Sequence, residues 1–504
     1  MRSRSREASQ FFLILAGVFG AAVRLYPVLK ADFPLVDGGM FYTMIRDLQA
    51  ANYSLPVFTS YNHAQIAYAY PPLGFYLAGL INSLGGLSLP STLHGLPVLF
   101  NIAVLPLFYL FIKEVSGSES KSALATLLFV LIPNSYWWSI VGGGLTRSLG
   151  TFFFMATLWS VVKLFQRTSM PWVALTSLLG AGTVLSHLTW ALQTLPAIGL
   201  LWYFLGREKQ NSKNLFIAGV GVLLLTSPWW ATVISRHGID VFAQAFQVNH
   251  SRWQAWTMLF ALSFTGEARP VLAVFALVGL FIHISKRDIF FVLWALLCLL
   301  VDPRGGTFAS VFPFALLAAS AITDGVAPQL TRTNDWESSL QTRTGKMFFA
   351  FFVILFLYNA YTISDDLSRE VLTSEQRNAL AWVKDHTDET AIFLVFDDQG
   401  NPLLSPLVEW FPALSERRNL TTIQGTEWLN GDQHYNRQMT LITNTRQCLL
   451  RDMNCVRKAT ANATVDYILV SAQAQTPLLS TLENDPQFIS AYSTESIYIF
   501  QFKK

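Results

Sequence analysis

Apolar runs long enough to cross a lipid bilayer recur along most of this chain of 504 residues. A helix needs about 20 apolar residues to span the hydrocarbon core of a membrane. Charged residues make up only 13% of the sequence, whereas soluble domains contain roughly 25%. The sequence therefore predicts a polytopic α-helical membrane protein. Its net charge of +3 is not gathered into a basic cluster with interleaved aromatic residues, so we expect no nucleic-acid partner.

The apolar runs predict about eleven transmembrane helices. They are expected at 11–29, 95–112, 121–140, 149–166, 171–187, 189–206, 214–234, 270–284, 289–301, 307–322 and 347–362. The run 71–86 is also apolar, but a crossing there would move the Lys and Arg residues of every later loop to the other side of the membrane. We therefore expect this run to lie in the outer interface of the bilayer.

Basic residues set the expected orientation. Arg2, Arg4 and Arg6 precede the first predicted helix, and short loops rich in Lys and Arg stay on the cytoplasmic side of a membrane. We therefore predict an integral protein of the plasma (cell) membrane with a cytoplasmic N-terminus. The predicted domains are a transmembrane domain at 1–362 and a soluble extracytoplasmic domain at 363–504.

The polar C-terminal region has the pattern of a small α/β domain. Thr373-Ser374-Glu375-Gln376 is a capping-box pattern and predicts a helix that continues to about Thr387. No glycine-rich phosphate loop follows a predicted strand, so we expect no nucleotide site. The predicted strands are 391–396, 466–471 and 496–502, with helices near 433–450 and 476–484.

Two cysteines lie in this predicted outer domain. Cys448 and Cys455 are separated by six intervening residues. An oxidising compartment would permit a disulfide between them, and the spacing leaves the bonded and the free states equally open. The spacing alone predicts no metal site.

Asp37 is the first candidate for chemistry, because it stands beside glycines in the polar stretch that follows the first predicted helix. The predicted topology brings further polar side chains to the same face of the membrane. Each also has a simpler structural interpretation, such as an interface anchor, a helix-end residue or a local ion pair. The substrate-binding candidates are Tyr70, Arg147, His187, Arg236, His237, Glu267, Asp302 and Arg304.

These side chains suit the transfer of a sugar from a lipid phosphate. Such a reaction needs a base for the acceptor and cations for the leaving phosphate. Asp37 is suited to act as the general base, and the guanidinium groups of Arg236 and Arg304 are suited to bidentate phosphate contacts. Glu267 offers a second acid, which would allow a divalent cation such as Mg²⁺ or Mn²⁺ to bind together with Asp37.

A known family shares the order of features at the start of the chain. An acid just beyond the first predicted helix is followed by an interfacial helix and by Tyr70-Pro71-Pro72-Leu73-Gly74-Phe75-Tyr76. This order resembles the GT-C membrane glycosyltransferases, and most of all the branch that contains the protein O-mannosyltransferases and the lipid A aminoarabinose transferase. The resemblance covers residues 10–362 in topology and mainly 31–80 in motifs. It implies a polyprenyl-phosphate-linked sugar donor, a lipid, glycan or protein acceptor, and Asp37 as the catalytic acid of the first outer loop.

The sequence departs from that family in its second acid. Many relatives have Asp-Glu in the first outer loop, whereas Gly38 follows Asp37 here, and residues 134–148 contain no acid. A lone base therefore fits better than half of a metal site, so no metal ligand is assigned and Glu267 is kept as the alternative second acid.

Acids and indoles also gather in the predicted outer domain, at 409–412 and 424–428. Sugars bind by stacking on aromatic rings and by hydrogen bonds to carboxylates, so acceptor binding is one interpretation of these segments. Packing of the outer domain on the membrane unit is the other interpretation, and it is the one we favour.

The sequence thus predicts a membrane glycosyltransferase that acts on the extracytoplasmic face. One alternative is a transporter or flippase of lipid-linked sugars, and another is a non-catalytic protein that keeps the fold for binding or assembly. Transporters tend to carry charged residues near the middle of the membrane. Here the charged residues other than Arg24 are predicted at one end of the helices, which favours the enzyme.

Overall fold

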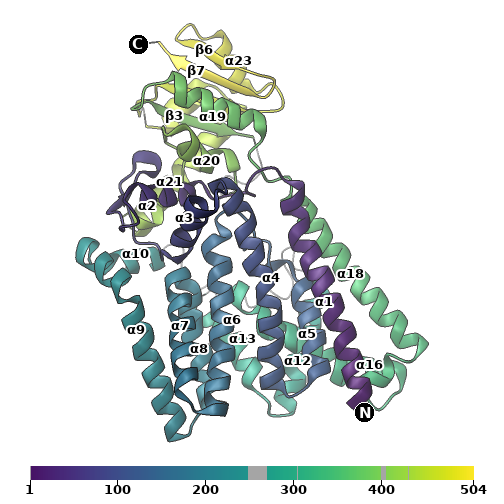
Figure 1. Ribbon diagram of the computed structural model, residues 1–504. Helices are drawn as coiled ribbons and strands as arrows, with labels where there is room; N and C mark the ends of the chain where they lie inside the picture. The colour runs from purple at the N-terminus through teal and green to yellow at the C-terminus, as the bar shows by residue number, and fades with distance from the viewer. Residues whose placement is uncertain are drawn as a thin grey trace.

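The computed structural model describes residues 2–247, 270–302, 305–398, 404–429, 431–461 and 463–503. A bundle of long helices makes up most of the chain, and a sheet domain sits at one end of it (Figure 1). The N-terminus lies at the other end of the bundle, and the C-terminus lies in the sheet domain (Figure 1). The protein is therefore a polytopic helical membrane protein with a C-terminal mixed-sheet domain.

Each of the eleven predicted transmembrane segments contains a helix. Within the described ranges, seven helical stretches are both long and apolar enough to cross a membrane, and the number of crossings stays a prediction. The helices of the bundle are α1 (Arg2–Lys30), α4 (Leu89–Ser116), α5 (Glu119–Leu131), α6 (Gly144–Arg167), α7 (Met170–Ser186), α8 (Leu188–Leu205), α9 (Lys209–His237), α10 (Asp240–Gln247), α12 (Pro270–Ser285), α13 (Phe290–Val301), α14 (Gly306–Ala309), α15 (Val311–Ala321), η3 (Ile322–Val326), α16 (Ala327–Thr331), α17 (Trp336–Ser339) and α18 (Arg343–Leu367).

The predicted segment 121–140 is helical only as far as Leu131. Pro133 follows closely, and the residue before a proline is pushed towards an extended backbone. Ile132 accordingly has φ −80° and ψ 117°, and a short 3-10 turn, η2 (Pro133–Ser135), comes next. The chain then loops back to the start of α6.

Arg24 is fully buried in α1 and joins three neighbouring elements. Its guanidinium donates to Asn101 Oδ1 of α4 at 2.6 Å, to the Val130 carbonyl of α5 at 3.0 Å and to Ser135 Oγ of η2 at 2.8 Å. A buried charge needs such partners. Arg24 therefore links α1, α4, α5 and η2 in the half of the bundle nearer to the sheet domain.

The chain between α1 and α4 forms the first outer segment, residues 31–88. It contains α2 (Gly39–Ala50), the antiparallel pair β1 (Phe58–Thr59) and β2 (Ile66–Ala67), the turn η1 (Tyr61–His63) between them, and α3 (Leu73–Gly85). Both α2 and α3 lie at the end of the bundle that faces the sheet domain (Figure 1). With 13 residues, α3 is shorter than the about 20 that span a bilayer, and its place in the membrane interface stays a prediction.

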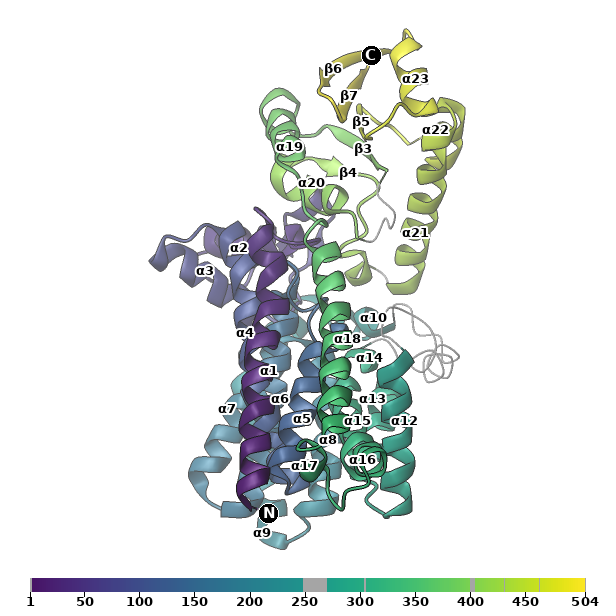
Figure 2. The ribbon, with the colours of Figure 1, turned by 90° about the vertical axis from the view of Figure 1, so that its right-hand side faces the viewer.

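The C-terminal domain has a five-stranded sheet in the order β4-β3-β5-β7-β6. Strands β4, β3 and β5 run parallel, and β7 is antiparallel to both β5 and β6. Helices pack beside this sheet, with α21 on one side in Figure 2 and α19 on the other. The elements are α19 (Ser374–His386), β3 (Ile392–Asp397), α20 (Pro406–Ser415), β4 (Arg418–Asn419), η4 (Thr426–Trp428), α21 (Gly431–Gln447), η5 (Cys448–Leu450), α22 (Met453–Ala459), β5 (Tyr467–Ser471), α23 (Pro477–Asn484), β6 (Phe488–Ser493) and β7 (Ile497–Phe502).

Local sequence signals predicted several of these elements well. The capping box of α19 is present, with Thr373 Oγ1 accepting from the Gln376 N–H and the Gln376 side chain accepting from the Thr373 N–H. Cys448 and Cys455 form a disulfide, which settles the open alternative. The sequence analysis missed the shorter elements α22 and β4, and also α20 and β6, although these two are as long as elements that it predicted.

One hydrophobic core joins the first outer segment to the sheet domain. Phe41 and Phe75 of the outer segment belong to the same buried cluster as Phe393 and Trp410 of the sheet domain. The connection to α19 also pairs with the first outer segment, since the Val36 N–H donates to the Glu370 carbonyl at 2.7 Å. The sheet domain is therefore docked on residues 31–88 and is not held by a flexible tether.

Candidate active site at the outer end of the bundle

Asp37 lies where the chain turns from α1 into α2. Its Oδ1 accepts a hydrogen bond from the Gly143 N–H at 2.7 Å, and its Oδ2 pairs with Arg147 Nη2 at 3.0 Å. The side chains of Asp37 and Arg147 are each 16% exposed, so the pair is sheltered and still within reach of a ligand. The structure thus joins two residues that the sequence predicted as parts of one site.

Glycines allow this close approach between Asp37 and the start of α6. A Cβ on Gly142 would collide with the Asp37 carbonyl oxygen, and a Cβ on Gly143 would stand 2.5 Å from Asp37 Oδ2. Gly38 has a φ of +129°, a backbone conformation that only glycine adopts without strain. The close approach of Asp37 to the run Gly142-Gly143-Gly144 therefore requires residues without a side chain.

Arg147 stands in the first turn of α6 and is held by the preceding loop. Its Nε donates to the Trp138 carbonyl at 2.9 Å, and its guanidinium lies 4.3 Å from the centroid of the Trp138 ring. These contacts aim the side chain at Asp37. The interface-anchor interpretation therefore does not describe how Arg147 lies, although its part in substrate binding stays a prediction.

A second acid lies beside Asp37, and it comes from the sheet domain. Glu409 of α20 is 3% exposed, and its two carboxylate oxygens accept the N–H groups of Gly39 at 2.8 Å and Met40 at 3.0 Å. Burial and the negative charge of Asp37 raise the pKa of Glu409 to about 8. The sequence analysis named Glu409 only for acceptor binding or packing, and its contacts correspond to packing.

Tyr70 and His187 form the neighbouring part of the outer end. Their ring centroids are 6.3 Å apart, and the Tyr70 ring also faces Trp428 of the sheet domain at 5.7 Å. A Cβ on Gly150, one turn along α6 from Arg147, would touch His187. His187 therefore lies beside α6 near Gly150, and Tyr70 lies beside His187.

Asp302 is buried at the end of α13, where its Oδ1 accepts the Gly305 N–H at 3.0 Å. A Cβ on Gly305 would meet Thr189, two residues after His187. Asp302 thus lies near the start of α8. Arg304, its predicted partner, and Glu267, the predicted second acid, both lie outside the described residues.

Arg236 and His237 end α9 and contact a different part of the first outer segment. Arg236 Nη1 donates to the carbonyls of Leu55 at 2.7 Å and Pro56 at 3.1 Å. The His237 ring faces Phe58, with 5.3 Å between centroids. None of the contacts described for these two side chains involves Asp37 or Arg147, so the structure does not bring the two groups of predicted residues together.

Comparison with known proteins identifies the fold. No protein-family model and no curated protein matches the sequence. The structure of ArnT from Cupriavidus metallidurans bound to undecaprenyl phosphate matches with a TM-score of 0.54 and 13% identity, over 96% of this chain and 97% of ArnT. The Archaeoglobus fulgidus oligosaccharyltransferase in complex with Zn and sulfate matches with a TM-score of 0.52 and 13% identity, over 91% of this chain and 68% of that protein. The chain has a GT-C fold.

A third match supports the same fold. The arabinofuranosyltransferase AftD from Mycobacteria aligns with a TM-score of 0.58 and 15% identity, and the match covers 97% of this chain and 40% of AftD. The predicted resemblance to GT-C membrane glycosyltransferases is therefore confirmed in the fold. At 13–15% identity the match speaks for the fold, so an activity has to be argued from the site.

In this GT-C chain, no three His, Cys, Asp or Glu side chains within the described ranges gather as a metal site would require. Each of the two carboxylate oxygens of Glu409 accepts a backbone N–H group, so we assign this acid to the backbone of α2 and not to a cation. A metal role for Asp37 would therefore need a partner from elsewhere, such as Glu267.

Proposed function

We propose that this protein is a GT-C glycosyltransferase. It transfers a sugar from a polyprenyl-phosphate carrier to a lipid, glycan or protein acceptor on the extracytoplasmic face of the membrane. The observation that carries the proposal is the sheltered pair of Asp37 and Arg147 at the end of a GT-C bundle, next to the first outer segment.

Asp37 and Arg147 supply the two functions that such a transfer needs. Asp37 takes the proton from the acceptor as its oxygen or nitrogen attacks the anomeric carbon. The bond from that carbon to the carrier phosphate breaks, and the phosphate leaves with the electron pair. Arg147 stabilises the leaving phosphate by charge-assisted hydrogen bonds. Binding of the donor phosphate competes with Asp37 for Arg147, and so frees the carboxylate to act as a base.

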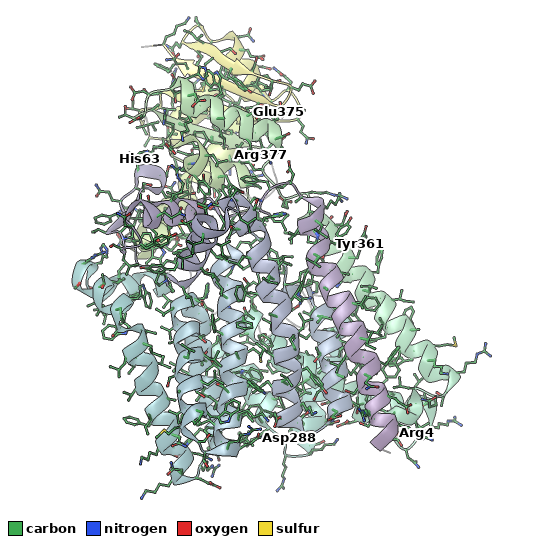
Figure 3. The ribbon with its side chains drawn as sticks, viewed as in Figure 1. Arg4, His63, Asp288, Tyr361, Glu375 and Arg377 are labelled. Carbon is green, nitrogen blue, oxygen red and sulfur yellow. A yellow bond between two sulfur atoms is a disulfide. The ribbon has the colours of Figure 1, made fainter. Side chains whose placement is uncertain are left out.

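The carrier lipid and the orientation follow from separate observations. ArnT, which shares this fold over nearly its full length, binds undecaprenyl phosphate, which supports a polyprenyl-phosphate donor. Arg4 and Asp288 lie at the end of the bundle away from the sheet domain, whereas Arg377 and Glu375 lie at the sheet domain (Figure 3). We place the Arg-rich N-terminal end in the cytoplasm and the sheet domain outside.

The remaining predicted residues keep substrate-binding roles in this proposal. We assign the rings of Tyr70 and His187, which face each other, to contacts with the sugar, and Asp302, near the start of α8, to the same part of the substrate. Arg236 and His237 are assigned to a more distant part of the donor or acceptor. Arg304 and Glu267 are candidates for phosphate and cation contacts.

Replacement of Asp37 by Asn tests the proposal. Loss of the general base should lower sugar transfer by about 10²–10⁴-fold, while a polyprenyl-phosphate-linked sugar still binds to the purified protein. Transfer at the wild-type rate would show that Asp37 is not the base. EDTA should leave the wild-type rate unchanged if Asp37 acts alone, and a loss that Mn²⁺ or Mg²⁺ restores would make it a metal ligand instead.

The two alternative functions, a flippase and a non-catalytic protein, predict different results. A flippase would move lipid-linked sugar across vesicles without forming a glycosylated product, and the contacts of Arg24 speak against one, because its guanidinium binds neighbouring helices. A non-catalytic protein would bind the donor and be indifferent to the Asp37→Asn change.

A further inference from the structure

We propose that Glu409 of the sheet domain is a positioning residue for Asp37, and that it makes sugar transfer depend on the docking of this domain. This inference rests on the proposed function and adds to it a part for the outer domain. Glu409 does not touch the substrate in this scheme. It acts through the first turn of α2, which begins two residues after Asp37.

The contacts of Glu409 replace the missing cap of α2. The first N–H groups of a helix have no partner within the helix, and the residue before α2 is Gly38, which has no side chain to supply one. Glu409, from a helix 370 positions further along the chain, accepts the N–H groups of Gly39 and Met40 with its two oxygens. Both bonds are buried, so water cannot take over their role.

Three further contacts hold α20 on this part of the first outer segment. The Tyr61 hydroxyl donates to the Glu409 carbonyl at 2.7 Å. The next residue, Trp410, is fully buried with its ring 4.7 Å from that of Phe33. A Cβ on Gly38 would stand 3.0 Å from this indole. The backbone on both sides of Asp37 is therefore fixed by neighbouring residues of α20.

The charge of Glu409 also acts on Asp37. The two acids repel each other, and Arg147 balances only the charge of Asp37. Tyr61 and Glu427 are further titratable groups near this point, and burial together with the neighbouring acids raises the pKa of Tyr61, which keeps its hydroxyl uncharged at neutral pH. Since the pKa of Glu409 is raised to about 8, Glu409 is neutral at pH 7. It gains a charge above pH 8, where it should repel the phosphate of the donor.

Two substitutions of Glu409 separate positioning from charge, and Glu416 offers a matched control. Glu416 also joins α20 to α2, through a salt bridge to Arg46 at 2.7 Å, but this bond is at the partly exposed surface. The experiment compares Glu409→Ala, Glu409→Gln, Glu416→Ala and Asp37→Asn in the full-length protein. Sugar transfer is measured between pH 6 and 9 with a polyprenyl-phosphate-linked sugar.

Glu409→Ala should lower kcat by at least about 10-fold and change the KM of the donor little, because a small displacement of a catalytic group is costly. Glu409→Gln keeps one acceptor oxygen for these two N–H groups and carries no charge, so its kcat at pH 7 should lie between those of Glu409→Ala and the wild type. In the wild type the donor KM should rise above pH 8, and in Glu409→Gln this rise should disappear. Glu416→Ala should behave as the wild type.

Wild-type kcat in a folded Glu409→Ala protein would overturn the inference, as would an unchanged pH profile in Glu409→Gln. If Glu409→Ala does not fold, the Glu409→Gln profile decides alone. A readout without activity is the infrared carbonyl band of protonated Glu409, whose titration midpoint should fall by about one pH unit in Asp37→Asn. Asp37→Asn at the wild-type rate would instead refute the proposed function. An inactive Asp37→Asn beside a fully active Glu409→Ala would refute only the role of Glu409.

Discussion

Arg147 and Arg236 both contact the first outer segment, and the sequence analysis named both as substrate-binding candidates, with only Arg236 suggested for the phosphate. The structure gives them different surroundings. Arg147 pairs with the Asp37 carboxylate, whereas Arg236 donates to two backbone carbonyls. An ionic partner can be exchanged for a donor phosphate, but a carbonyl that loses its donor must find another one. The comparison shows that charge on the correct face is not enough, because the partner decides what an arginine can do.

Among the tests of this comparison, the largest loss of sugar transfer should come from a substitution of the glycines that leave room for Asp37 beside α6. A Cβ on Gly142 would collide with the Asp37 carbonyl, so Gly142→Ala must move Asp37 away from Arg147. We expect a loss of about 10²-fold in sugar transfer, measured with the same donor assay. Gly199→Ala in α8 is the control, because nothing lies within 4 Å of a Cβ at that position. Equal activities of the two variants would mean that the backbone around Asp37 need not be fixed.

The two arginines themselves should differ next. Arg147→Lys removes a planar group that bonds Asp37 and Trp138 together, and about 1.5–3 kcal/mol is typical of such charged hydrogen bonds. That corresponds to about 10–100-fold in rate. Arg236→Lys should cost less than about 3-fold. A larger loss at Arg236 than at Arg147 would place the phosphate at the Leu55–Pro56 side.

The Glu409 contact predicts how stability varies with pH. Its folded-state pKa of about 8 lies above the ordinary 4.5 of a Glu side chain, so the folded protein keeps a proton that the unfolded chain releases. Glu409 therefore contributes most to the free energy of unfolding below about pH 4.5. This contribution is lost as the pH rises through 8. The change should be a few kcal/mol. Thermal unfolding between pH 5 and 9 measures it, and Glu409→Gln should flatten the curve.

The smallest effect should come from the surface link between the same two helices. Arg46 and Glu416 are 46% and 38% exposed, and such pairs contribute about 0–1 kcal/mol. A double-mutant cycle with Arg46→Ala and Glu416→Ala should therefore give a small coupling energy that decreases with salt. A coupling above about 2 kcal/mol would mean that this pair, and not only Glu409, holds α20 on α2.

Much of the chain could be predicted because its signals are local. Apolar runs located a helix in all eleven predicted segments, the capping box located α19, and short continuous apolar runs located β3 and β5 as buried strands. α20, α22, β4 and β6 were missed. Pro133 ended α5 earlier than hydropathy indicated, since hydropathy records burial in lipid and not the backbone restriction that a proline imposes.

The sequence by itself determined that this is a polytopic membrane protein with an acid shortly after its first helix. These properties follow from hydrophobicity and from residues close together in the chain. Only the tertiary structure decided which groups surround that acid. Arg147 is 110 positions away from Asp37 and Glu409 is 370 away from Gly39. Such pairings depend on how helices pack and on where a docked domain excludes water. Neither produces a periodic pattern of residues in the sequence.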